Sequence, residues 1–318
     1  MIGTFGRENF QCLGKYCKNF PIYKAMNSFS TYTAELGKYT GKVLVAPSGR
    51  FKAKDIQESL FSALQVEQHL RALIPIEELR DAGSFFTGDS MADTAVEYFG
   101  DSVSSKSFVV DPACGAGNLL IACSKKLPIK KFSLKKTQGI WGQCLAGFDL
   151  FEEFIETTKL RLILEAVSRG ARPDISNIDD AKDLFPYIHE GNAFDYEPTL
   201  KGATHIILNP PYYKMEASAE CEWADGKINA AAKFLEMVAK CADTNTHVSA
   251  ILPDVLRSGT RYGKWRSLIS AKLNCSVLSA GRFDSKTDVD VFLLNGQVTP
   301  VTIDPDWLWK SFNKAPHL

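Results

Sequence analysis

FVVDPACGAGNLL, residues 108–120, decides the fold of this 318-residue chain. Its first residues predict a short apolar strand that ends at Asp111, and a turn with Gly115 and Gly117 leads into a helix. Because the two glycines lack a Cβ, the backbone there can approach a ligand closely. Position 120 is leucine where a dinucleotide-binding turn has its third glycine, and the Gly-Lys-Ser/Thr of a P-loop is absent. Asp111 therefore favours a cationic or amine-bearing ligand, and a tight turn without a ligand is the alternative.

The segments around this turn alternate between strand and helix. Further buried strands are predicted over residues 143–148, 204–208 and 247–252, with one near the sheet edge over 289–294. Helices are predicted over residues 91–99, 119–127, 151–168 and 230–242, and a helical pattern covers 54–79. This order favours an α/β fold with a Rossmann-like, doubly wound, mostly parallel sheet. Helices are expected on both faces of that sheet, after an N-terminal helical extension.

The composition excludes several classes of protein. Lysine plus arginine and aspartate plus glutamate both total 37, so the formal net charge is zero. Any nucleic-acid contact must therefore rest on a local basic patch. No run approaches the ~20 apolar residues of a membrane span, and the N-terminus lacks the apolar core of a secretory signal. We expect a cytoplasmic protein with no membrane partner. The eight cysteines show no C-x-x-C spacing and the five histidines are scattered, which favours free thiols and no metal site.

Polar residues follow the ends of several predicted strands. They are Asp111, Asp149, Asn192 and Asn209. Ligands of parallel sheets bind beyond the carboxyl ends of the strands, and a carboxylate at the second strand end binds ribose hydroxyls. Asp149 occupies that place, although an aspartate before a helix can also be a simple helix cap.

The segment IILNPPYY, residues 206–213, carries the most specific signal. Pro210 and Pro211 fix an extended, rigid turn after Asn209. The Asn209 side-chain carbonyl and the backbone carbonyl beside it are two acceptors that suit an exocyclic NH2 group. Tyr212 offers a flat face for stacking a base. A plain Pro-Pro loop is the alternative.

Together, NPPY and DPACGAGNLL resemble the amino-methylating, S-adenosylmethionine-dependent DNA methyltransferases, in the N6-adenine branch of restriction-modification systems. The resemblance covers residues 84–294 and includes FFTGDSMADTAVEYF (85–99), FDLF (148–151) and GNAFDYEP (191–198), although Gly88 stands where the family usually has proline. It implies catalytic roles for Asn209, Pro210, Pro211 and Tyr212. It implies S-adenosylmethionine contacts from Thr87, Asp111, Ala113, Gly115, Gly117, Asp149, Leu150, Asn192, Ala193 and Asn209.

The resemblance implies direct methyl transfer to N6 of an adenine that is flipped out of the duplex. Hydrogen bonds from N6 to Asn209 and to the Pro210 carbonyl would direct the nitrogen lone pair toward the sulfonium methyl. Tyr212 would stack on the base, with Phe283 or Phe292 as the second aromatic wall. We expect an N-terminal extension over residues 1–80, the methyltransferase domain over 81–300 and a C-terminal tail over 301–318.

Double-stranded DNA is the implied partner. Phosphate contacts are predicted for RSGTRYGKWR (257–266), through Arg257, Arg261, Lys264 and Arg266. KKLPIKKFSLKK (125–136) is a second candidate, and a solvated charged loop is the alternative for both. The chain ends 24 residues after Leu294, which is too short for the family's target-recognition domain. We therefore expect a separate specificity subunit or endonuclease. Trp307 and Trp309 in the tail either anchor this partner or dock on the domain itself.

Two other functions stay open. A protein glutamine-N5 methyltransferase also uses NPPY after an N-terminal helical domain, although FFT and DPACGAGNLL look like the DNA branch. Labelled methyl transfer to DNA or to protein separates these two. The second is a non-catalytic methyltransferase fold that only binds DNA or partners, against which the intact Asp111, Gly115, Asn209 and Tyr212 argue.

Overall fold

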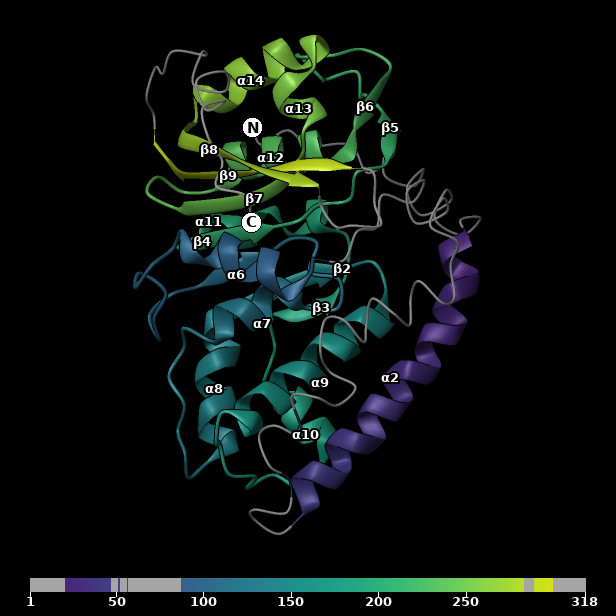
Figure 1. The fold of residues 1–318 in the computed structure, drawn as a ribbon, viewed down its shortest axis with the longest axis vertical. Coiled ribbons are helices and arrows are strands. Elements are labelled where there is room, and N and C mark those ends of the chain that lie inside the picture. The colour runs from purple at the N-terminus through teal and green to yellow at the C-terminus, as the bar shows by residue number, and fades with distance from the viewer. Residues whose placement is uncertain (1–20, 47–50, 52–55, 57–86, 283–288, 300–318) are drawn as a thin grey trace, which may run out of the picture.

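The computed structural model describes residues 21–46, 51, 56, 87–282 and 289–299, and in them seven strands form one sheet (Figure 1). The strand order is β3-β2-β1-β4-β7-β9-β8. The strands are β1 (Val109–Asp111), β2 (Leu145–Asp149), β3 (Ile188–Glu190), β4 (His205–Leu208), β7 (His247–Pro253), β8 (Leu273–Arg282) and β9 (Asp290–Val298). Strand β9 runs antiparallel to both of its neighbours, and the other adjacent pairs are parallel. The predicted mostly parallel, doubly wound sheet is confirmed.

Helices cover both faces of this sheet. One layer contains α6 (Asp89–Glu97), α7 (Asn118–Ser124), α8 (Leu134–Cys144), α9 (Glu152–Ser168) and α10 (Ile178–Lys182). The other contains η1 (Ala193–Tyr196), α11 (Glu197–Lys201), α12 (Ala230–Cys241), α13 (Val255–Ser258), η2 (Thr260–Tyr262) and α14 (Gly263–Ser270). The helices predicted over 91–99, 119–127, 151–168 and 230–242 are confirmed within a few residues, while the one over 54–79 lies almost wholly outside the described residues.

Two strands of the seven-stranded sheet, β8 and β3, are not among those predicted from the sequence. Strand β8 forms the edge of the sheet, so the strand predicted near that edge over 289–294 lies one place further inside as β9. Strand β8 was not predicted because its apolar pattern is short: Leu273 and Val277 are buried, but its other described side chains are half-buried or exposed. Strand β3 spans only three residues, too few for a period-2 pattern to stand out.

A long helix, α2 (Pro21–Val45), lies against the outer side of α9 (Figure 1). Phe29, Tyr32 and Leu36 are buried on one face of it, at helical spacing. They pack in a cluster with Phe154 of α9 and with Ala116 of the glycine turn. Each such side chain contributes about 1.5–3 kcal/mol of burial free energy. Helix α2 therefore supports the glycine turn from behind.

A two-stranded hairpin follows the NPPY segment, formed by β5 (Lys214–Glu216) and β6 (Lys227–Asn229). Its loop is fixed to α12, because the Trp223 indole donates a hydrogen bond to the buried Glu236 carboxylate at 3.1 Å. Lys233 and Lys240 pair with the same carboxylate at 3.0 and 2.6 Å. The chain after NPPY is thus tied to the core.

The remaining general expectations concern cysteines and membranes. Cysteines 114, 123, 144, 221, 241 and 275 are free thiols, as predicted, while the first two cysteines lie outside the described residues. Within the part of the chain that the structure describes, no helix is long and apolar enough to span a bilayer.

Candidate active site

The glycine turn is packed tightly against α9. Gly115 and Gly117 have φ angles of 50° and 85°, in the left-handed region that favours glycine. A Cβ on Gly117 would lie 2.6 Å from the Thr158 methyl carbon. The Thr158 hydroxyl donates to the Gly115 carbonyl at 2.9 Å. The backbone conformation therefore favours glycine at both positions, and the closeness of α9 also excludes a side chain at Gly117.

Two carboxyl groups lie beneath this turn. Asp111 is buried, and its Oδ1 accepts a hydrogen bond from the Ala113 amide at 3.1 Å. Its Oδ2 is buried with no hydrogen-bond partner among the described residues. Burial raises the pKa of Asp111 to about 8, the Ala113 amide opposes this, and the charge of Asp149 adds to it. With this raised pKa, Asp111 is mostly protonated at neutral pH, and among the described residues no cation pairs with it.

Asp149 shapes the turn from the end of β2. Its two oxygens accept from the Gly115 amide at 3.0 Å and from the Phe151 amide at 3.1 Å. Burial raises the pKa of Asp149 to about 6, against the effect of these hydrogen bonds. The Leu150 amide adds a third backbone hydrogen bond to this carboxylate. Because a carboxylate has about four acceptor sites, it can still accept from a hydroxyl donor.

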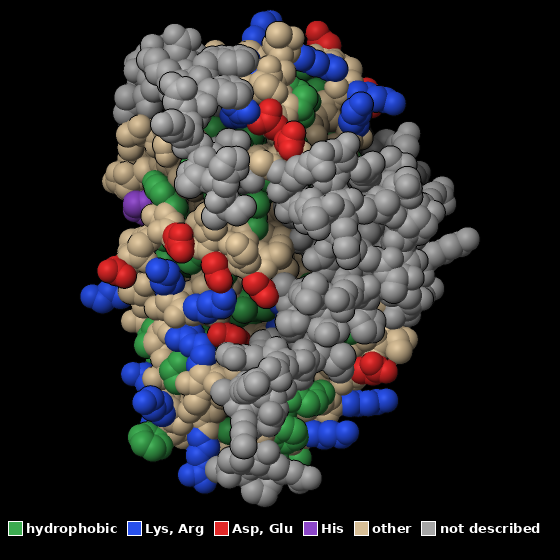
Figure 2. All heavy atoms as spheres, viewed as in Figure 1, with side chains coloured by type: hydrophobic (Ala, Val, Ile, Leu, Met, Phe, Trp, Pro, Cys, Tyr) green, Lys and Arg blue, Asp and Glu red, His purple; other side chains and the backbone are tan. Residues whose placement is uncertain are grey.

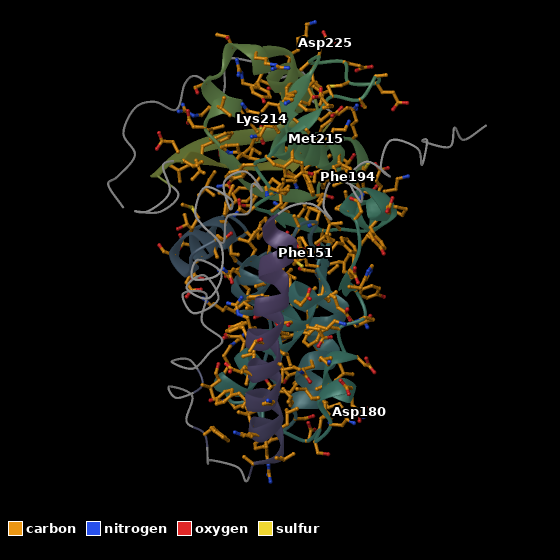
Figure 3. All side chains as sticks on the ribbon, turned by 90° about the vertical axis from the view of Figure 1, so that its right-hand side faces the viewer. Phe151, Asp180, Phe194, Lys214, Met215 and Asp225 are labelled. Carbon is orange, nitrogen blue, oxygen red and sulfur yellow. The ribbon has the colours of Figure 1, made fainter. Side chains whose placement is uncertain are left out.

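The loops after β2 and β3 add partly apolar surface on the same edge of the sheet. Leu150 is 43% exposed, and Phe151 and Phe194 are half-buried (Figure 3). Asn192 Oδ1 accepts from the Phe194 amide at 3.3 Å and so begins η1, while Ala193 is buried. These residues follow strand ends as the sequence predicted, and Asn192 also serves as a helix cap.

The NPPY segment leaves the end of β4 on this edge. Asn209 Nδ2 donates to the Thr87 hydroxyl at 2.9 Å, and Asn209 Oδ1 accepts from the Tyr212 hydroxyl at 2.7 Å. The Tyr212 hydroxyl also lies 3.2 Å from the Ile251 carbonyl, and its ring is 8% exposed. Pro210 is buried and Pro211 half-buried. The Asn209 amide is therefore fixed at both ends by hydroxyl groups.

Three residues of the site that sequence reasoning missed join these segments. The Asn118 side chain, at the start of α7, donates to the Thr87 carbonyl. Arg161 of α9 donates to Asn118 Oδ1 at 2.5 Å and to the Ala116 carbonyl. Thr158 holds the turn as described above. The one available signal was Arg161, a charged residue among the buried leucines and isoleucine of 160–164.

Gly88 has the backbone geometry that the family's usual proline would have. Its φ is −64°, which is the value imposed by a proline ring. A Cβ at this position would meet nothing within 4 Å. The departure from the family pattern therefore leaves the local backbone conformation intact.

Two of the four predicted phosphate contacts are wrong. Arg257 is buried, and its guanidinium donates to Asp254 Oδ1 at 2.5 and 2.8 Å. Arg266 is buried too, and it donates to the Leu256 and Gly259 carbonyls at 3.1 and 2.8 Å. Both side chains fold back onto α13 and the loop after it, which spacing along the sequence does not reveal. Arg261 and Lys264 are exposed and stay predicted contacts.

The other predicted positions are the second aromatic wall, the tail and the lysine-rich stretch. Phe292 is fully buried in β9, so it is wrong as a second wall for the base. Phe283 and the tail with Trp307 and Trp309 lie outside the described residues. The lysines of 125–136 are exposed, at the lower left of the molecule where α8 lies (Figure 2). Lys125 pairs with Asp93 at 2.8 Å, and the phosphate role of this stretch stays a prediction.

Comparisons with known proteins identify the family of this chain and the fold that it shares with solved structures. Residues 67–269, more than half of the chain, match the family model described as N-6 DNA Methylase. The M protein of the type I restriction enzyme EcoKI is 14% identical, with a TM-score of 0.51 over 89% of this chain and 63% of that chain. A DrdV–DNA complex is 13% identical, with a TM-score of 0.55 over 79% of this chain and 30% of that chain.

A structure concerned with assembly of the type I R-M system is 16% identical, with a TM-score of 0.51 over 78% of this chain and 48% of that chain. At such identities the likeness concerns the fold alone. This chain spans less than two thirds of each of these three solved chains.

Proposed function

This chain belongs to the N-6 DNA methylase family, and we propose that it transfers a methyl group from S-adenosylmethionine to N6 of an adenine in DNA. The observation that carries the proposal is the Asn209 amide. It lies at the end of β4, held by two hydroxyls, on the sheet edge where the glycine turn lies. An amide fixed in this way is a preorganised hydrogen-bond acceptor.

The residues of the turn fit S-adenosylmethionine. This molecule carries positive charge on its sulfonium and ammonium groups, and Asp111 Oδ2 is a buried acceptor without a partner among the described residues. The left-handed backbone at Gly115 and Gly117 holds this turn in a tight conformation directly above the two carboxyl groups. We assign donor binding to Thr87, Asp111, Ala113, Gly115, Gly117, Asp149, Leu150, Asn192 and Ala193. When bound, the donor supplies an electrophilic methyl group on a positively charged sulfur.

The chain's own contribution to the reaction is the alignment of the amino group. The lone pair of N6 is delocalised into the adenine ring, so N6 is a weak nucleophile. Asn209 Oδ1 and the Pro210 carbonyl accept the two N6 hydrogens, which favours a tetrahedral nitrogen with its lone pair directed away from the ring. Alignment of reacting groups is worth several kcal/mol of barrier. Tyr212 lines this place, and the base must leave the duplex to reach it.

DNA phosphates are proposed to meet Arg261 and Lys264, the two exposed cations of the 257–266 segment. We propose that another chain, a specificity subunit or an endonuclease, supplies sequence readout. The neighbours include a type I R-M assembly and a protein–DNA complex, which supports this proposal.

The test is methylation of unmethylated plasmid DNA with a labelled donor, by the chain alone and with the products of neighbouring genes. Nuclease digestion and mass spectrometry identify the modified base, and an equal assay on total protein covers the glutamine alternative. We expect N6-methyladenine from the wild type. Asn209→Ala should abolish it while donor binding, measured by calorimetry, stays nearly intact.

The matched control is Asn274→Ala, on the exposed surface at the start of the edge strand β8, which should keep full activity. Label in protein rather than in DNA would replace the proposal with the glutamine reaction. If neither DNA nor protein is labelled while donor binding is intact, the chain is a non-catalytic methyltransferase fold.

A further inference from the structure

The position of the Asn209 amide depends on a residue from a distant part of the chain. Thr87 lies 122 positions earlier, and its hydroxyl accepts the hydrogen bond from Asn209 Nδ2 at 2.9 Å. The opposite end of the amide accepts from the Tyr212 hydroxyl at 2.7 Å. With both ends engaged, rotation of the amide about its side-chain bonds is restricted. The two hydroxyls therefore form a clamp on Asn209.

Thr87 is itself held by the scaffold of the glycine turn. It is 5% exposed, and its carbonyl accepts from the side chain of Asn118, which is also buried. Asn118 Oδ1 in turn accepts from Arg161, at 2.5 Å. Arg161 is 2% exposed and also donates to Ala116, between the two glycines. Hydrogen bonds in such a buried network are stronger than in water and orient one another.

One hydrogen-bonded chain therefore runs from α9 through the start of α7 to Asn209. Its members come from four separate elements, and it touches both the glycine turn and the NPPY segment. Misplacement of a reacting group by about 1 Å can cost about a hundredfold in rate. A chain that sets both segments from one scaffold limits such misplacement.

We propose that Thr87 is a positioning residue for methyl transfer, which holds the Asn209 amide in the place where Oδ1 accepts a hydrogen from N6. This rests on the proposed function, and it gives Thr87 a role beyond the donor contact that the resemblance implies. The hydroxyl of a threonine accepts through two lone pairs and donates one hydrogen. It therefore holds Asn209 and still has a hydrogen for another acceptor.

The test compares Thr87→Val, which removes the hydroxyl at nearly constant shape, with Thr87→Ser, which keeps it. We expect kcat to fall about tenfold or more in Thr87→Val, because the amide loses one of its two fixed ends. The KM for DNA and the calorimetric Kd for S-adenosylmethionine should change by less than about threefold. Thr87→Ser should recover most of the lost kcat.

Asn118→Ala provides a second arm. Because Asn118 acts through Thr87, the double variant with Thr87→Val should lose little more kcat than Thr87→Val alone. Additive losses would mean that the two residues act separately. A weakened donor Kd with kcat preserved would make Thr87 a donor contact only. Equal losses of kcat in Thr87→Ser and Thr87→Val would mean that the packing of the Thr87 side chain, and not its hydroxyl, matters for the reaction.

A measurement without turnover separates this inference from the proposed function. In protein labelled with ¹⁵N-asparagine, the Asn209 side-chain amide protons should exchange slowly with water in the wild type and in Thr87→Ser. They should exchange faster in Thr87→Val. An inactive wild type with this pattern would refute the methyltransferase proposal and keep the clamp, while equal exchange in all three proteins would refute the clamp.

Discussion

The buried carboxyl of Asp111 should make the stability of the protein fall as the pH rises. Its side chain is 1% exposed, and burial raises its pKa from 3.8 to about 8. Between these two values the folded state binds a proton that the unfolded state has released. Stability therefore decreases with pH across this window, because the folded state binds more protons than the unfolded state.

The size of the effect follows from the displacement of the pKa. About four pKa units correspond to on the order of 5 kcal/mol between pH 4 and pH 8, at 1.36 kcal/mol per unit. Asp149, with its pKa raised to about 6, contributes in the same direction over the lower part of this window. Asp111→Asn removes the Asp111 part and keeps an oxygen for the Ala113 amide.

The assay is urea unfolding of the wild type and Asp111→Asn at several pH values from 4 to 8. As the pH rises from 4 to 8, the unfolding free energy of the wild type should fall by a few kcal/mol relative to that of Asp111→Asn. Since a cationic donor favours the ionised carboxylate, the wild type should also bind S-adenosylmethionine more tightly at pH 8 than at pH 6. The variant should bind it weakly at both.

Asp174→Asn is the control of opposite sign. Partial burial opposes ionisation of Asp174, but hydrogen bonds from the Ser133 hydroxyl and the Lys135 amide outweigh it and lower the pKa of this carboxyl. The wild type should therefore gain stability over Asp174→Asn as the pH rises through the acidic range. A stability difference between the wild type and Asp111→Asn that is constant from pH 4 to pH 8 would refute the reasoning about Asp111.

Three further predictions concern the backbone at Gly88 and the basic segment 257–266. Gly88→Pro should stabilise the protein by about 0.4–1 kcal/mol, because the native φ suits proline and the unfolded chain loses freedom; a lower melting temperature would contradict this. Arg257→Ala should destabilise the fold by about 1.5–3 kcal/mol, because it removes the charge-assisted hydrogen bonds to the half-buried Asp254. Arg261→Ala with Lys264→Ala should leave stability nearly unchanged but weaken DNA binding and flatten its dependence on salt, and an unchanged salt slope would exclude these two as phosphate contacts.

Helix α2 and the edge strand show where sequence patterns stop. Helix α2 has a clear buried face, but its partners lie on α9 more than a hundred residues later. It also lies within the first fifty residues of the chain, whose composition is mixed. Strand β8 alternates between inward and exposed side chains from Leu273 to Leu278, but only Leu273 and Val277 are fully buried, so its apolar pattern is short. Helix α8 begins in the lysine-rich stretch, and several of its buried residues, such as Thr137, Gln138 and Gly142, are not large apolar side chains, so its hydrophobic periodicity is weak.

The residues alone predict the glycine turn, the NPPY segment and the five central strands with the helices that alternate with them. These features are local: hydrophobic periodicity, glycine and proline act within a few residues of where they stand. Only the tertiary structure decided that Arg257 and Arg266 turn inward while Arg261 and Lys264 face solvent. It alone brought Thr87 to Asn209 and Arg161 to the glycine turn, because such contacts depend on how distant segments pack and not on the residues beside them.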